Sequence, residues 1–118
     1  LAHKIGGEFG VTHGLANAIL LPYIIDFNRK FTKKYDYVEH VLGVRDLAQA
    51  IRDLNARLEI PRTFKDCDEV DFSEAKFQKV LGRMSERALA DPCTLTNPGK
   101  PCVADVKALY TAAYYGNA

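Results

Sequence analysis

The stretch HKIGGEFGVTHGLANAILLP, residues 3–22, decides the fold that this sequence predicts. A glycine-rich segment carries His13 directly into a long apolar run, and His3 lies ten residues before it. The apolar side chains of residues 15–27 cover nearly the whole circumference of a helix, which is typical of a buried helix. Pro22 lies inside this run, so we expect a kink or a local break there.

The rest of the chain predicts four further helices and no strand. Apolar residues with helical spacing indicate helices over 35–42, 44–58, the segment after Asp71, and 102–115. Gly43 is a plausible C-cap, and Asp71 with Glu74 has the spacing of a capping box in which Asp71 is the N-cap. We therefore predict an all-α fold of about five helices.

Composition limits the class of protein. The chain has 118 residues, of which 47% are hydrophobic and 26% charged, as expected for one globular domain. A formal net charge of +1 argues against a nucleic-acid or acidic-membrane partner, and the basic run 29–35 is interpreted as a solvated helix end. No apolar run reaches the roughly 18 residues of a membrane span, and no signal peptide is recognisable.

Three cysteines without metal-type spacing indicate a reduced, cytoplasmic protein. We interpret Cys67 and Cys102 as ordinary thiols, and Cys93 as a thiol without special reactivity. The sequence starts without a methionine and inside an apparent element, so we expect a fragment of a longer polypeptide.

His13 is the candidate metal ligand, because imidazole is the side chain that most often binds transition metals. Gly10 and Gly14 let the backbone approach a bound group, and a helix that begins near His13 presents free N–H groups. An ordinary helix-start residue is the alternative. A metal needs three or four protein ligands, and His40 is expected to face solvent. If His13 binds a metal, most of its other ligands must lie outside this chain.

Two segments of the sequence resemble the motifs of a known protein family. The segment AHKIGGEFGVTHGLANAILLPYIIDFN resembles the signature of the iron-containing (group III) alcohol dehydrogenases, and DPCTLTNPGKPCVADVKALYTAAYYG looks like the final loop and helix of that family. The ending AAYYG is most similar to bifunctional aldehyde–alcohol dehydrogenases, and LEIPRTFKD resembles the family's GIP linker. The matching signature positions are Ala2, His3, Gly6, His13, Gly14, Asn17, Ala18, Leu21 and Pro22.

The resemblance implies that residues 1–118 are the helical C-terminal, metal-site portion of such an enzyme, without its nucleotide-binding domain. It implies Fe²⁺ or Zn²⁺ held by one Asp and three His, of which His13 matches the last. His3 matches a histidine near the nicotinamide of NAD(H) and the substrate, and Cys93 matches a residue of the catalytic cleft. The implied reaction is hydride transfer between NAD(H) and an aldehyde, with acetaldehyde as the expected substrate.

The resemblance also implies two kinds of protein contact: the remainder of the same polypeptide, and further copies of it in a homo-oligomer. The chain alone is expected to be inactive. Two positions depart from the family pattern: Thr12 stands where proline is usual, and Gly99 replaces an arginine, with Lys100 next to it. The alternative function is a self-standing helical interaction module without catalysis.

Overall fold

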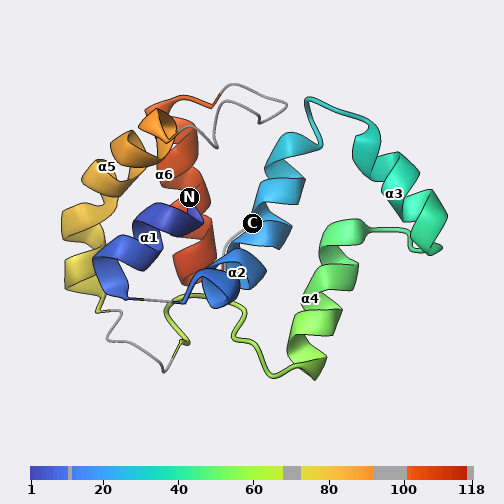
Figure 1. Ribbon diagram of the computed structural model, residues 1–118, viewed down its shortest axis with the longest axis horizontal. Helices are drawn as coiled ribbons and strands as arrows, with labels where there is room; N and C mark the ends of the chain where they lie inside the picture. The colour runs from blue at the N-terminus through green and yellow to red at the C-terminus, as the bar shows by residue number, and fades with distance from the viewer. Residues whose placement is uncertain (11, 68–72, 92–100, 117–118) are drawn as a thin grey trace.

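The computed structural model describes residues 1–10, 12–67, 73–91 and 101–116, but not the side chains of His3 and His13. All regular structure in these residues is α-helical, which confirms the predicted all-α class (Figure 1). The described chain contains six helices instead of the predicted five: α1 (Ala2–Phe9), α2 (His13–Asn28), α3 (Lys34–Leu42), α4 (Leu47–Arg57), α5 (Glu74–Ala90) and α6 (Val103–Tyr115).

The additional helix is α1, in the glycine-rich segment for which the sequence predicted no helix. Ala2, Ile5 and Phe9 have helical spacing and are buried against α2 and α5. Glycine disfavours a helix by about 1 kcal/mol relative to alanine, and α1 contains Gly6 and Gly7. Burial of one apolar face outweighs this penalty, which a local sequence pattern does not reveal.

Helix α2 lies in the middle of the molecule and packs against α1, α4 and α6 (Figure 1). The main core lies between α1, α2, α5 and α6, and its largest side chains include Ile5, Ile19, Phe77 and Tyr110. A smaller core between α2 and α4 contains Ile25, Leu47 and Ala48. Nowhere in the described chain is a helix both long and apolar enough for a membrane span.

Of the two effects expected at Pro22, the local break is absent because α2 is one continuous helix across it, and the kink stays a prediction. Proline has no N–H, so the carbonyl of Ala18, one turn earlier, loses its usual helical donor. The Asn55 side chain of α4 replaces that donor, because its Nδ2 donates to the Ala18 carbonyl at 2.9 Å. A side chain 37 residues away thus supplies the hydrogen bond that the proline removes.

Two predicted helix starts are wrong by two or three residues. Helix α4 begins at Leu47, because the Asp46 side chain accepts from the Gln49 N–H as an N-cap. Helix α5 begins at Glu74 with Ser73 as its N-cap, instead of Asp71, which lies outside the described residues. Short polar side chains next to one another compete for the same cap, and the sequence pattern did not distinguish them.

The end of α4 forms a Schellman motif. The Glu59 N–H donates to Ala56 O and the Ile60 N–H to Asn55 O, at 3.2 and 2.8 Å. This geometry places Glu59 at φ 59°, the left-handed region that favours glycine. In the GIP pattern that the sequence resembles, a glycine occupies this position. Gly43 and Gly116, with φ 71° and 87°, end α3 and α6, and this confirms Gly43 as the C-cap of α3.

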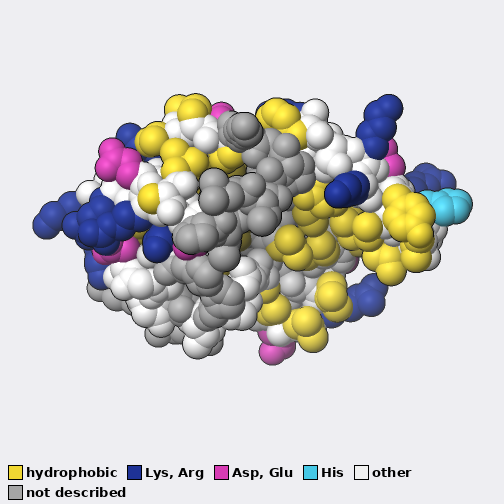
Figure 2. Space-filling model, turned by 45° about the horizontal axis from the view of Figure 1, so that its top comes forward, with side chains coloured by type: hydrophobic (Ala, Val, Ile, Leu, Met, Phe, Trp, Pro, Cys, Tyr) yellow, Lys and Arg dark blue, Asp and Glu magenta, His cyan; other side chains and the backbone are white. Residues whose placement is uncertain are grey.

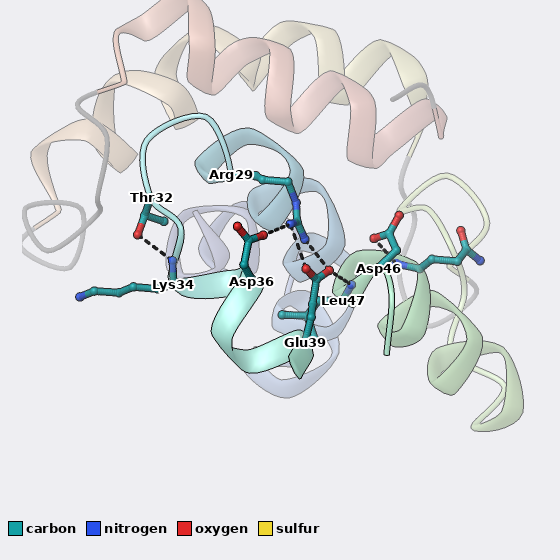
Figure 3. Close-up of polar contacts among 8 residues, drawn as sticks. Arg29, Thr32, Lys34, Asp36, Glu39, Asp46 and Leu47 are labelled. Carbon is teal, nitrogen blue, oxygen red and sulfur yellow. Dashed lines mark hydrogen bonds and ion pairs between the residues drawn. The ribbon is translucent and has the colours of Figure 1, made fainter. Parts of the chain in front are cut away.

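An ion-pair cluster joins the end of α2, helix α3 and the start of α4 (Figure 3). Arg29 donates to both carboxylate oxygens of Glu39, at 3.1 and 2.8 Å, and to Asp36 at 3.2 Å. The Leu47 N–H donates to the same Glu39 carboxylate at 2.6 Å. Arg29 and this N–H hold the pKa of Glu39 below its usual 4.5.

Replacing Asn55 with alanine should lower the free energy of unfolding by about 0.5–1.5 kcal/mol, because the Ala18 carbonyl loses its donor. In a Pro22→Ala background the same change should have a smaller effect, since residue 22 then supplies its own N–H. Urea unfolding of the four proteins gives the coupling. If the changes in unfolding free energy caused by the two substitutions are additive in the double variant, the proposal that Asn55 replaces the missing N–H of Pro22 is wrong.

Glu39→Gln should destabilise the protein at neutral pH. The folded-state pKa is lowered, so the stabilisation by Glu39 is present above about pH 4.5 and is lost as the pH falls through the lowered value. The difference in unfolding free energy between wild type and Glu39→Gln should therefore shrink on acidification. Glu86→Gln, at an exposed position of α5, is the control, and its difference should show no such trend.

Glu59→Gly should stabilise the protein by a few tenths to about 1 kcal/mol, because glycine adopts φ 59° without the steric strain of a Cβ. Glu59→Ala removes the same exposed side chain but keeps the Cβ, so it should give no such gain. Chemical unfolding of both variants measures the difference. A gain of equal size in the alanine variant would show that the side chain, and not the backbone angle, is responsible.

Candidate functional site

Both candidate histidines lie in the first turn of a helix. His3 is the second residue of α1, and His13 is the first residue of α2. The two helices are joined through Gly10, whose left-handed φ of 74° ends α1. A helix does begin at His13, as predicted, and the side chain of its N-cap Thr12 makes no capping hydrogen bond. The N–H groups of this turn are thus not used by Thr12.

The backbone dihedral angles of Thr12 are those that a proline at this position would have. Its φ is −61°, close to the proline value of about −65°, with an extended ψ of 145°. Proline is usual at this position in the pattern that the sequence resembles. The departure therefore preserves the angle at which the chain enters α2.

One face of the α1–α2 pair is open. Gly14, Asn17 and Leu21 are exposed along α2 at the spacing i, i+3, i+7. A Cβ placed on Gly10 or Gly14 would meet no atom of the described residues within 4 Å. Room for a bound group or for another segment therefore exists beside the turn that carries His13.

A hollow of about 340 Å³ lies on this open face, between the start of α1 and the side of α2. Its lining includes Ala2, next to His3, and Asn17, one helical turn after His13. Most of the surface is apolar, from Leu1, Leu20 and Ile24 among others. The hollow thus extends from the residue before His3 to the helical turn after His13.

Long-range contacts fix the start of α1. The Tyr110 hydroxyl of α6 donates to the Leu1 carbonyl at 2.6 Å, and Lys4 pairs with the buried Asp91 at 3.6 Å. Burial, and secondarily the charge of Asp91, raise the pKa of Tyr110 far above its usual range, so its hydroxyl remains a donor. These contacts hold the turn that carries His3.

A second ion pair fixes the other end of α1. Arg83 of α5 donates to both oxygens of Glu8, at 2.9 and 2.8 Å, and Arg87 lies 3.5 Å from the same carboxylate. The hydrogen bond from Arg83 is the main cause of the lowered pKa of Glu8. Helix α1 is therefore anchored at both ends before its chain turns into α2.

Within the described part of the chain, no three His, Cys, Asp or Glu residues lie close enough together to hold a metal ion. The side chains of His3 and His13 and the whole of Cys93 fall outside the described residues, as do Gly99 and Lys100. His40 is exposed on α3, as predicted, and Cys67 and Cys102 are free thiols. The described residues therefore do not form a complete metal site by themselves.

Sequence reasoning did not assign a role to Asn17 or to Tyr110. The i, i+3, i+7 spacing of Gly14, Asn17 and Leu21 was a signal for the exposed face of α2. No local signal indicates the contact between Tyr110 and Leu1, because 109 residues separate them.

The chain matches the model of the "Fe-containing alcohol dehydrogenase family, C-terminal" over residues 1–114. It is 34% identical to an NADPH-dependent butanol dehydrogenase of Clostridium saccharobutylicum and 36% identical to an alcohol dehydrogenase of Thermococcus barophilus. Each match covers 98% of this chain, and 32% and 30% of the relative. The bifunctional aldehyde-alcohol dehydrogenase of Escherichia coli is 28% identical, and the match covers 98% of this chain and 16% of the relative.

The fold agrees with a solved structure, the iron-containing alcohol dehydrogenase of Thermococcus thioreducens. The TM-score is 0.84 at 31% identity, covering 98% of this chain and 31% of that one. The helical fold therefore matches the C-terminal part of a class of alcohol dehydrogenases. This chain belongs to the Fe-containing alcohol dehydrogenase family, and it spans about a third of the length of the first relatives that it matches.

Proposed function

We propose that this chain is the C-terminal helical portion of a longer iron-dependent alcohol dehydrogenase, which interconverts an aldehyde and its alcohol with a nicotinamide cofactor. The observation that supports this most directly is the position of His13, which opens α2 at an exposed turn beside the hollow. Acetaldehyde and NAD(H) are the proposed substrate and cofactor. One relative's name specifies NADPH, so the cofactor is a point for direct measurement.

In this proposal His13 is one ligand of Fe²⁺ or Zn²⁺, and an Asp and two further His come from outside the chain. The open space at Gly10 and Gly14 supports the fit, because a Cβ at either glycine would meet no described atom within 4 Å. When bound, the metal acts as a Lewis acid on the carbonyl or alkoxide oxygen. The long, buried helix α2 provides a rigid support for its ligand.

His3 is proposed to contact the substrate and the nicotinamide without binding metal. An imidazole can donate or accept a proton near neutral pH, which suits exchange of the alcohol proton. Tyr110 and Lys4 hold the first turn of α1, so they act as positioning residues for His3. Cys93 is proposed to line the cleft. The cofactor would supply the hydride, and the chain the orientation.

We further propose a cytoplasmic parent that forms a homo-oligomer and has a nucleotide-binding domain outside these 118 residues. The proportion of the relatives that the chain covers supports a longer parent. No metal site forms within the described residues, so the chain alone is proposed to be inactive.

In the longer enzyme, His13→Ala and His3→Ala should fail in different ways. Loss of a ligand should remove the metal and the activity together, since even the loss of a residue that only supports a ligand reduces affinity or activity by roughly 10–100-fold. Loss of His3 should leave the metal content near stoichiometric while lowering kcat by about 10²–10⁴-fold. Metal analysis and steady-state kinetics on the same preparations measure both quantities.

His40→Ala is the matched control, because His40 is exposed on α3, and it should retain metal and activity. Full metal content in His13→Ala would refute the ligand assignment. Metal loss in His3→Ala equal to that in His13→Ala would refute the separation of roles. If both variants keep metal and activity, His3 and His13 have only structural roles in the enzyme.

A further inference from the structure

Helix α3 faces the molecule with its polar side. Glu39 is 8% exposed and points toward Arg29 and the start of α4 (Figure 3). Tyr35 packs against the small core and accepts a hydrogen bond from Asn28. An amphipathic helix of a globular protein usually buries its apolar side instead. The attachment of α3 therefore depends largely on an ion pair, and its apolar side is left outward.

The outward side of α3 forms a contiguous apolar stripe. Residues at i, i+1, i+4 and i+5 lie on one face of a helix, and four large side chains have this spacing. Figure 2 shows hydrophobic side chains gathered over the α3 end of the molecule, with Lys and Arg side chains around them. We define the α3 face as five exposed residues: Phe31, Tyr37, Val38, Val41 and Leu42.

The margin of the α3 face is basic. Residues 29–46 contain five Lys or Arg and three carboxylates. Asp36 and Glu39 are both paired with Arg29, and Asp46 caps α4. The other four cations are exposed: Lys33, Lys34 and Arg45 lie beside α3 in the sequence, whereas the Nζ of Lys30 lies over the Phe27 ring, 5.4 Å from its centroid. An apolar surface with such a margin is complementary to apolar side chains flanked by carboxylates.

We propose that the α3 face is a docking surface for an acidic, amphipathic segment of a partner protein. Val41 and Tyr37 lie along the stripe and make the apolar contact, and the cations of the basic run 29–35 pair with partner carboxylates. The basic run, which the sequence indicated to be merely solvated, would thus take part in binding the partner. This inference does not depend on the catalytic roles proposed for His3 and His13.

The charges around the α3 face favour an acidic protein segment over two alternatives, a second copy of this chain and a membrane surface. Pairing of two copies through α3 would bring two basic margins together, which is unfavourable. Membrane-surface helices are generally rich in Lys and Arg on their polar side. Helix α3 contains a single lysine and two carboxylates, both engaged by Arg29. A protein partner fits these charges better than either alternative.

The test measures binding of a fluorescent helical peptide of about four turns, with Leu on one face and Glu elsewhere, to the 118-residue chain. We expect binding that weakens with added salt, and little binding of the same peptide with Lys in place of Glu. Val41→Gln should weaken binding by about tenfold or more, and the double variant Lys33→Gln/Lys34→Gln should weaken it and reduce its salt dependence.

Leu58→Gln is the matched control, because Leu58 is 60% exposed at the far end of α4 and Val41 is 63% exposed on α3. It should leave binding unchanged, and circular dichroism should show that all variants remain folded. Equal binding by Val41→Gln and wild type, or no binding at about millimolar peptide, would overturn the proposal. Self-association abolished by Val41→Gln would assign the face to a second copy, and preferential binding to phosphatidylserine vesicles would assign it to a membrane; either would overturn it.

Discussion

The burial of α2 is the constraint on which the rest of this structure depends. A helix that packs on several sides needs every backbone polar group paired, because water does not reach the unpaired ones. Pro22 removes one donor inside this helix, and Asn55 of α4 restores it at the Ala18 carbonyl. The proline therefore does not break α2 but ties it to a helix far along the chain. Helices α1 and α6 then pack on the same continuous scaffold.

Where a segment's structure follows from its own residues, the sequence predicted it well. The apolar circumference of α2, the Gly43 end of α3 and the pattern of α6 are all local properties. Helix α1 was missed because Gly6 and Gly7 argue against a helix, whereas the burial of Ile5 and Phe9 that stabilises it is tertiary. Asn55 looked like an ordinary polar residue of α4, since its partner lies on another helix. Leu54 and Leu58 continued the apolar pattern of α4, yet both are exposed.

In the candidate site, too, the sequence predicted local features and missed those that depend on tertiary packing. Motif resemblance singled out His3 and His13, and the structure places both positions in first turns of helices at an open face. The resemblance could not indicate how those turns are held. The hydroxyl of Tyr110 reaches Leu1 across the core, and Arg83 fixes Glu8 at the opposite end of α1. Such contacts form only when α5 and α6 pack against α1, so they cannot be predicted from local sequence patterns.

The molecule separates physically into two regions with different kinds of attachment. Helices α1, α2, α5 and α6 share one large apolar core, which holds the backbone of both histidines. Helix α3 contributes little apolar surface to either core and is fixed mainly through Glu39, Arg29 and the Leu47 N–H. Apolar packing in the large core does not include α3. A partner bound on the outward face of α3 can therefore leave the geometry of the α1–α2 turn intact.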